Sequence, residues 1–220
     1  MAKSLLDIVV AATGLVLTSP ILVFAAVGIR LTSPGPVIYR AQRVGRYGSP
    51  FTMFKFRTMH VGKGEQWSTI TAQNDSRVFW FGRLLRSTKV DELPQLFNVL
   101  RREMSIVGPR PEDPAIVAQH YTPEFRCTLD VLPGLASPGS IYNYTHGETL
   151  PGQAQTETAY VEELLPVKMA LELEYLQRAS MLYDLQIIWR TATVITLKMC
   201  GRTEFPAPPE MQRSQPRLAA

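Results

Sequence analysis

Residues 91–112 read DELPQLFNVLRREMSIVGPRPE, and this stretch decides the fold of the middle of the chain. Its first half carries four apolar residues at the i, i+3, i+4 and i+7 spacing of a helix with one buried face: Leu93, Leu96, Phe97 and Leu100. Proline is tolerated only in the first turn of a helix, so Pro94 requires the helix to begin close to Asp91. We therefore predict a helix from Asp91 to Arg102, followed by a rigid turn around Arg110.

Two adjacent carboxylates, Asp91 and Glu92, stand at the start of this predicted helix. Backbone donors and the macrodipole at a helix N-terminus favour negative charge, so we expect Asp91 to be ionised at neutral pH. Arg110, fixed between Pro109 and Pro111, offers a two-pronged donor that suits phosphate. The combination indicates phosphate chemistry. The simpler alternative is a capping Asp with a first-turn Glu, which carries no chemistry.

Residues 4–29 are almost wholly apolar and are interrupted near the middle by Ser19-Pro20. The run is long enough to span a bilayer, and it is too long for a signal peptide. Pro20 removes a backbone donor and favours a bend, while the Ser19 hydroxyl can occupy the backbone acceptor that the break frees. Basic residues stand on both sides of the segment: Lys3 before it, and Arg30, Arg40, Arg43 and Arg46 after it.

Basic residues mark the cytoplasmic side of membrane helices, so both ends of this segment resemble cytoplasmic ends. We therefore expect residues 1–30 to form a re-entrant membrane anchor with a helix–break–helix shape. A Pro-kinked helix that crosses the whole membrane is an alternative that the sequence leaves open.

After the anchor, residues 37–39 and 51–56 resemble short strands around a turn at Gly45-Arg46-Tyr47-Gly48, which predicts a β-hairpin. Residues 60–76 are polar and are predicted to form a loop. Residues 78–87 mix aromatic side chains with arginines, which is typical of an amphipathic helix lying in the headgroup plane. An ordinary helix facing a protein core has the same pattern. The apolar stretch 181–200 predicts a further helix, either buried or interfacial.

Length and composition limit the organisation of the chain. It has 220 residues, a formal charge of +4 and a pI near 9.2, which allows an anchor and one modest domain with anionic partners. We expect a mainly helical α+β fold, with the anchor at 1–30, a catalytic domain on the cytosolic face at 31–200, and a disordered Pro- and Arg-rich tail at 201–220. His60, His120 and His146 are scattered, and no HExxH, Walker A or GxGxxG pattern occurs.

A set of short motifs accompanies these features: Lys3, Asp7, Ser19-Pro20, Arg43, Gly45, Gly48, Lys55-Phe56-Arg57-Thr58-Met59, Arg86-Ser87, Asp91 to Leu100, Met104 to Pro111, Pro133-Gly134, Ser180 and Asp184. Together they resemble the bacterial sugar transferases, also called monotopic phosphoglycosyl transferases. The resemblance covers roughly residues 3–195 and is strongest between Arg86 and Pro111. We expect no additional membrane domain ahead of the anchor, so that the chain is similar to the minimal form of that family.

The resemblance implies an activity: transfer of a sugar 1-phosphate from a nucleoside diphosphate sugar, with UDP the expected nucleotide, to polyprenyl phosphate, with undecaprenyl phosphate the expected acceptor. Asp91 would attack the sugar-bearing phosphorus and form an aspartyl phosphosugar, dividing one displacement into two. Glu92 would assist with metal binding or proton transfer. Mg²⁺ would be held by Asp91 and phosphate oxygens, with Arg57, Arg86 and Arg110 as phosphate contacts.

The same resemblance places the protein at the cytoplasmic face of the bacterial inner membrane, where its product would start a glycan such as an exopolysaccharide. Membrane lipids are expected partners, a homodimer and downstream glycosyltransferases are compatible with it, and no nucleic acid is expected. One departure is the stretch 132–140, LPGLASPGS, where the family usually has a basic residue before Pro-Gly and Thr-Gly after it. This difference leaves the sugar open.

Two other functions fit parts of the sequence. A membrane-anchored metal-dependent glycosyltransferase would normally need an Asp-x-Asp pair, which the chain lacks. A non-enzymatic membrane adapter would use the basic residues for binding only, and would leave Asp91, Glu92 and the arginine–proline turn unexplained.

Overall fold

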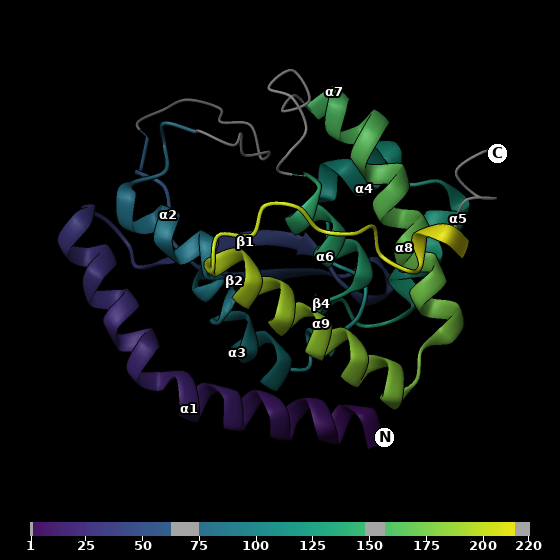
Figure 1. Ribbon diagram of the computed structural model, residues 1–220, viewed down its shortest axis with the longest axis horizontal. Helices are drawn as coiled ribbons and strands as arrows, with labels where there is room; N and C mark the ends of the chain where they lie inside the picture. Colours follow the sequence, from purple (N-terminus) through teal and green to yellow (C-terminus); the bar gives the residue numbers. More distant parts are fainter. Residues whose placement is uncertain (1, 63–74, 148–156, 214–220) are drawn as a thin grey trace.

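Helices surround a small β core in the computed structural model, which describes residues 2–62, 75–147 and 157–213 (Figure 1). The long helix α1, Ala2–Thr32, lies along the lower edge of Figure 1, while α8, Leu165–Arg178, and α9, Met181–Met199, cover other sides of the domain. The predicted α+β class with a majority of helix is confirmed.

The predicted hairpin is present. Strand β1, Ile38–Val44, pairs antiparallel with β2, Pro50–Phe56, in a register from Ile38↔Phe56 to Val44↔Pro50. The short helix η1, Arg46–Gly48, joins the strands, with Tyr47 and Gly48 in the left-handed region. The buried side chains along the two strands are Ala41, Val44, Met53 and Phe56. Because side chains alternate along a strand, Ala41 and Met53 lie on one face of the hairpin and Val44 and Phe56 on the other, so each face is packed in part against the domain.

A second sheet, which the sequence did not predict, pairs β3, Ser105–Val107, with β4, Gly134–Ala136, in parallel. Parallel strands need a crossover connection. It consists of α4, Pro114–His120, α5, Pro123–Arg126, and η3, Cys127–Asp130. The pairing brings the atypical stretch 132–140 directly beside the turn that carries Arg110. The next helix, α6, Pro138–Thr145, begins at the end of β4.

The helix predicted from Asp91 to Arg102 is divided into η2, Val90–Glu92, and α3, Gln95–Leu100. Pro94 precedes the first residue of α3, in keeping with its restriction to a helix start. Leu96 and Val99 are buried, but the Phe97 side chain is exposed, contrary to the predicted core face. The helix packs on α1 through the Leu96 side, which turns Phe97 outward. Upstream of η2 lies α2, Trp80–Ser87.

Helix α1 continues through Ser19-Pro20 instead of breaking there, and Figure 1 shows it bending near its middle. Pro20 cannot donate to the carbonyl of Val16, four residues earlier, and Ser19 Oγ donates to that oxygen at 2.8 Å. This confirms the predicted use of the Ser19 hydroxyl. Among the described residues α1 is the one helix apolar and long enough to cross a membrane, and most of its surface is exposed.

The start of α1 is attached to the domain through two charged side chains. Near its start, Lys3 Nζ contacts Asp184 and donates to the carbonyl of Val107 at 3.1 Å. Asp7 accepts from Ser105 Oγ at 2.8 Å and from the amide of Ile106 at 3.2 Å. These contacts tie the start of α1 to β3 and α9.

The remaining helices are α7, Glu157–Ala159, a π-helical turn at Tyr160–Leu164, and then α8 and α9. Helix α9 confirms the helix predicted over 181–200, and Ile187 from α9 and Tyr175 from α8 join the main core cluster. The outer face of α9, including Trp189, is exposed.

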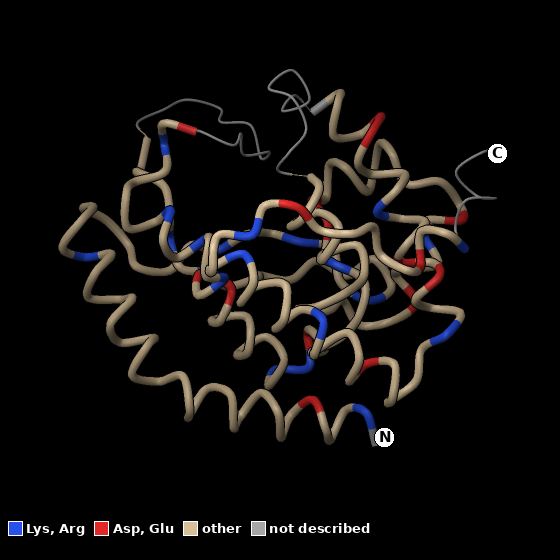
Figure 2. Tube along the Cα trace, viewed as in Figure 1, with Lys and Arg blue, Asp and Glu red and all other residues tan. Residues whose placement is uncertain are grey.

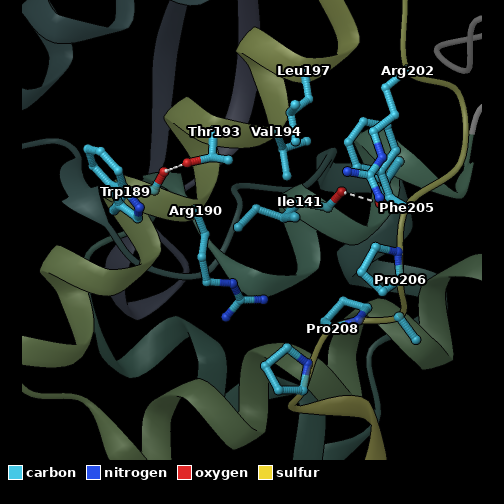
Figure 3. A pocket seen from close by; sticks show the side chains of 13 residues that line it. Ile141, Trp189, Arg190, Thr193, Val194, Leu197, Arg202, Phe205, Pro206 and Pro208 are labelled. Carbon is cyan, nitrogen blue, oxygen red and sulfur yellow. Dashed lines mark hydrogen bonds between the residues drawn. The ribbon is translucent and has the colours of Figure 1, made fainter.

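The C-terminal tail differs from its prediction. Composition predicts disorder from residue 201, but the structure places residues 201–213 against α9, and residues 214–220 lie outside the described part. Arg190 Nη1 lies 2.5 Å from Glu210 Oε1, and Tyr183 donates to the same oxygen at 2.6 Å. Figure 3 shows Arg202, Phe205, Pro206 and Pro208 around a cavity of about 310 Å³ that they share with α6 and α9. An ion pair with a buried carboxylate therefore opposes the flexibility of the Pro-rich sequence.

Candidate active site

Asp91 lies in the one-turn helix η2 and is almost completely buried, with 7 % of its surface exposed. Its Oδ1 has no hydrogen-bond partner within the described ranges of the chain. Buried polar atoms in proteins are nearly always paired, so an unpaired carboxylate oxygen needs an explanation such as a bound ion or a catalytic role. Asp91 does not cap η2 or α3 through its side chain, which removes the simple capping interpretation.

Glu92 gathers cations next to Asp91. Arg110 binds it with both terminal nitrogens, Nη2 to Oε1 at 2.6 Å and Nη1 to Oε2 at 3.1 Å. Lys55 Nζ lies 3.3 Å and Lys89 Nζ 3.6 Å from the same Oε1. Figure 2 shows basic positions clustered around the acidic segment between α2 and α3. Glu92 and Arg110, each predicted separately as a site residue, therefore lie together in the structure. Their ion pair was not predicted.

Arg86 belongs to the same region. It lies in the last turn of α2, and its Nε donates to Thr58 Oγ1 at 2.9 Å. Its charge, like those of Lys55 and Lys89, acts to lower the pKa of Asp91. Four cationic side chains therefore surround two carboxylates, which leaves a net positive site for an anionic substrate.

The two carboxylates differ in their protonation equilibria. Burial raises the pKa of Asp91, and the neighbouring charge of Glu92 adds to this rise, while the lysines and Arg86 oppose it. Burial alone would also raise the pKa of Glu92, but Arg110, Lys55 and Lys89 outweigh it and hold this pKa well below the usual range. The expectation that a helix N-terminus favours ionised Asp91 is thus incomplete, because desolvation acts in the opposite direction.

The oxygen ligands near Asp91 suit a metal ion that is held jointly by the protein and the substrate phosphates better than a metal ion held by protein side chains alone. The described residues contain no cluster of three or more His, Cys, Asp or Glu side chains with metal-binding geometry. Asp91 Oδ1 is a buried oxygen without a hydrogen-bond partner among the described residues, whereas both oxygens of Glu92 already accept from Arg110. Magnesium commonly uses one or two carboxylates together with substrate phosphates. The residues present fit that arrangement, with Asp91 as the protein ligand.

The turn that carries Arg110 rests on a buried carboxylate. Glu172 Oε1, from α8, accepts from the Arg110 amide at 3.3 Å and from Ser137 Oγ at 2.7 Å. A Cβ at Gly139 would lie 2.5 Å from the same oxygen, so only glycine fits there without displacing Glu172. Ser137 and Gly139 of the atypical stretch 132–140 therefore position Glu172, and Glu172 in turn holds the backbone amide of Arg110.

A buried lysine, Lys168, interacts electrostatically with Glu172. Its ammonium group contacts a different carboxylate, Glu112, whose Oε1 also accepts from Tyr160 at 2.7 Å. Burial lowers the pKa of Lys168 to about 7 and raises the pKa of Glu172 to about 7. No sequence pattern pointed to Glu172 or Lys168, because they stand more than 50 residues after Arg110 in an ordinary amphipathic helix.

Arg57, the other predicted phosphate contact, is engaged elsewhere. Its guanidinium donates to the carbonyl of Pro36 at 2.5 Å, to Ser33 Oγ at 2.9 Å and to the Ser33 carbonyl at 2.7 Å. These bonds fix the turn that follows α1. A phosphate contact by Arg57 remains a prediction, and it would have to coexist with this structural role. Lys55 and Lys89, which we did not predict as site residues, lie nearer to the carboxylates.

Comparison with known proteins identifies the family. The sequence model of the bacterial sugar transferase family matches residues 1–198. A UDP-glucose:undecaprenyl-phosphate glucose-1-phosphate transferase of Caulobacter vibrioides is 38 % identical over 194 residues, which is 87 % of this chain and 68 % of that protein. The protein of the same name from Escherichia coli is 36 % identical over 192 residues, 84 % of this chain and 38 % of its own length.

A third relative is an exopolysaccharide production protein of Rhizobium meliloti, 32 % identical over 215 residues, or 90 % of this chain and 86 % of the relative. The family match covers nine-tenths of the chain, from the start of α1 almost to the end of α9. It includes Asp91, Glu92 and all of the cations around them. The chain belongs to the bacterial sugar transferase family.

Proposed function

We propose that this protein transfers a sugar 1-phosphate from a nucleoside diphosphate sugar to polyprenyl phosphate at a membrane surface. The observation that carries the proposal is Asp91: a buried carboxylate with an unpaired oxygen, set among four cations and next to a Glu92 that is already engaged. The names of the relatives indicate UDP-glucose and undecaprenyl phosphate as the first substrates to test.

In the first step Asp91 Oδ1 attacks the sugar-bearing phosphorus. The bond from this phosphorus to the bridging oxygen breaks, the nucleoside monophosphate leaves with the electron pair, and an aspartyl phosphosugar forms. In the second step an oxygen of polyprenyl phosphate attacks the same phosphorus, and the bond to Asp91 breaks. The product is a polyprenyl diphosphosugar, and the carboxylate is regenerated.

Glu92 is a poor candidate for the attacking group because both of its oxygens accept hydrogen bonds from Arg110. We propose that it serves instead to hold Arg110, Lys55 and Lys89 around the phosphates. Positioned cations stabilise charge that develops in phosphoryl transfer. Lys55 and Lys89 also oppose the rise that burial causes in the pKa of Asp91, which must be ionised to attack.

Mg²⁺ is the proposed cofactor, with Asp91 as its protein ligand. When bound it would neutralise charge on the phosphates and on the leaving group. Arg86 and Arg110 would bind phosphate oxygens from the protein side, Arg110 with its planar guanidinium held in place by Glu92 and by its amide bond to Glu172.

We further propose that α1 enters one leaflet and returns, at the cytoplasmic face of the bacterial inner membrane. The support is that both of its ends attach to one domain: Lys3 to Asp184, and the turn after the helix to Arg57. A helix across the bilayer would place its ends about 30 Å apart on opposite sides. Its exposed apolar side chains are Leu5, Val9, Val10, Val16, Leu17, Ile21, Val23, Phe24, Val27 and Leu31.

Helix α2 exposes Trp80 and Leu84 while it buries Phe81 and Leu85 in the domain. We propose that this outer side lies in the headgroup layer. The active site would then sit at the depth of the lipid phosphate, and the lipid-linked product would pass to glycosyltransferases that extend it.

The activity is tested with the full chain in detergent, UDP-glucose, undecaprenyl phosphate and Mg²⁺. We expect release of UMP and a lipid-linked glucose phosphate. Release of UDP would indicate a glycosyltransferase, and lipid binding without turnover of any nucleotide sugar would indicate an adapter. Asp91→Asn should abolish transfer, whereas Asp130→Asn, on the surface, should not.

The intermediate is tested with donor labelled on the β-phosphate and no acceptor. A quenched sample should carry label on the peptide that contains Asp91, and the label should leave when undecaprenyl phosphate is added. Label on another residue, or full transfer activity in Asp91→Asn, would overturn the assignment of the nucleophile.

The topology is tested with cysteines at positions 2 and 34 in a variant whose Cys127 and Cys200, both free and exposed, are replaced by serine. A re-entrant helix predicts that both positions react only from the cytoplasmic side. Reaction of position 2 from the periplasm alone would establish a spanning helix.

A further inference from the structure

Lys89, two residues before Asp91, has an unusual backbone conformation. Its φ is 57° and its ψ is 13°, in the left-handed region that a side chain with a Cβ disfavours. The residue links the end of α2 to η2, and glycine would make this turn without strain. The backbone geometry therefore does not explain why a lysine stands here. A strained residue beside a reactive group is a reason to look for a function of its side chain.

The ammonium group of Lys89 is the most loosely held cation around Glu92. Its Nζ lies 3.6 Å from Glu92 Oε1, beyond hydrogen-bond distance, whereas Arg110 approaches to 2.6 Å. Its side chain is 28 % exposed, compared with 21 % for Lys55 and 18 % for Arg110. Lys89 is therefore the cation that can leave Glu92 for an incoming anion at the smallest loss.

The ring of Tyr144, from α6, holds the lysine in place. Lys89 Nζ lies 4.3 Å from the ring centroid, within the range of a cation–π contact. A second ammonium group, Lys198 Nζ from α9, lies 3.9 Å from the same centroid. Two cations that share one ring repel each other, and a bound anion relieves that repulsion.

Tyr144 is itself anchored beside the site. Its hydroxyl donates to the carbonyl of Ser87 at 2.7 Å, and its own carbonyl accepts from Lys198 at 2.6 Å. Ser87 ends α2, so the ring is fixed to the same corner of the chain that carries Lys89. The aromatic ring therefore sets the direction of Lys89 without occupying its hydrogen-bond donors.

We propose that Lys89 binds a phosphate oxygen of the substrate beside Asp91, and that Tyr144 is a positioning residue that directs it there. This inference rests on the proposed phosphoglycosyl transfer. The phosphate belongs either to the nucleoside diphosphate sugar or to the polyprenyl phosphate, and both present the same oxygen ligands to an ammonium group.

Lys89→Gly separates this role from a structural one, because it removes the ammonium group and also relieves the left-handed strain. We expect the KM for one phosphate substrate to rise about tenfold, the lower end of the effect of a charge-assisted hydrogen bond. The midpoint of thermal unfolding should be unchanged or higher. The KM for UDP-glucose is measured at a fixed concentration of undecaprenyl phosphate, and the KM for undecaprenyl phosphate at a fixed concentration of UDP-glucose. Inhibition by inorganic pyrophosphate is measured in parallel.

The control is Arg102→Gly, which relieves the same strain (φ 60°) and removes a surface cation outside the site. It should leave both KM values within about twofold of wild type, since surface charges contribute little. A higher KM for UDP-glucose with weaker pyrophosphate inhibition assigns Lys89 to the donor, and a higher KM for undecaprenyl phosphate assigns it to the acceptor. Unchanged values for both substrates in Lys89→Gly would overturn the proposal.

Tyr144 is tested by a double-mutant cycle. Tyr144→Leu removes the ring and should raise the KM for the same substrate that Lys89→Ala affects. Tyr144→Phe keeps the ring and should raise this KM less. The effects of Lys89→Ala and Tyr144→Leu should not multiply in the double variant, because they remove one interaction. Multiplied effects would show that Tyr144 does not act through Lys89. If wild type itself transfers nothing, the proposed function fails, which is a different result from a variant that behaves as wild type.

Discussion

Arg110 binds Glu92 with two parallel hydrogen bonds, Nη2 to Oε1 at 2.6 Å and Nη1 to Oε2 at 3.1 Å. The pair joins the arginine–proline turn after β3 to the one-turn helix that carries Asp91. Both side chains are largely buried, 18 % and 11 % exposed, so screening of the pair by water is reduced. Glu92 therefore acts as an organiser of cations, and Asp91 is the carboxylate left open for chemistry.

Arg110→Lys should lower kcat/KM for UDP-glucose by about 10- to 100-fold, since an ammonium group cannot reproduce a two-pronged contact. The measurement is steady-state transfer at saturating acceptor. Arg101→Lys is the matched control, because Arg101 also pairs with a glutamate, Glu103 at 3.0 Å, but has a side chain that is 60 % exposed. Equal effects of the two substitutions would contradict the special role of Arg110.

Arg57→Ala should lower the midpoint of thermal unfolding by about 4–8 °C, as expected for a loss of about 2 kcal/mol when buried hydrogen-bond partners are left unpaired. The unpaired groups would be the Ser33 and Pro36 carbonyls after α1. Arg40→Ala, at an exposed position of β1, should have no such effect. A raised KM for the donor with an unchanged unfolding midpoint would instead support the phosphate contact that the sequence predicts.

Gly134→Ala should destabilise the protein by about 3 kcal/mol or more, the range for a steric conflict in a packed core. A Cβ at this position would lie 2.1 Å from the Gly108 amide nitrogen, so β4 would have to separate from β3. The readouts are thermal unfolding and resistance to protease. Gly14→Ala in α1 meets only a flexible Leu96 methyl group at 3.2 Å and should be tolerated. Normal stability of Gly134→Ala would show that the two strands are less closely packed.

Glu172→Gln should change how stability depends on pH. The pKa of Glu172 is raised from 4.5 to about 7 by burial, so between these values the folded protein binds more protons than the unfolded chain. Stability contributed by this group is therefore fully present below pH 4.5 and is lost as the pH rises to about 7. Linkage gives a loss of up to about 3 kcal/mol over this interval.

The glutamine variant should lose this dependence, and unfolding midpoints measured at several pH values would show a flatter profile between 4.5 and 7. Glu163→Gln, an exposed site on the preceding helical turn, should keep the profile of wild type. A steep profile that survives in Glu172→Gln would assign the dependence to another group.

Local patterns in the sequence were sufficient for the features that depend on near neighbours. Short strand-like runs on either side of the turn Gly45-Arg46-Tyr47-Gly48 predicted the hairpin, and the position of Ser19 before Pro20 predicted a bond to a freed backbone acceptor, which is the carbonyl of Val16. The pattern failed where packing decides orientation. Phe97 has helical core spacing, yet it faces outward because α3 meets α1 through Leu96.

By itself the sequence determined the hairpin, the long apolar N-terminal segment, the carboxylate pair and the arginine between two prolines, because each depends on residues that are near neighbours in the chain. Only the tertiary structure decided that Glu92 holds Arg110, that Glu172 supports the Arg110 amide and that Arg57 fastens the turn after α1. These contacts join residues from 18 to 62 positions apart. Charge type alone cannot select such partners, since the chain has 23 basic and 19 acidic residues, and burial and strand pairing decide which of them meet.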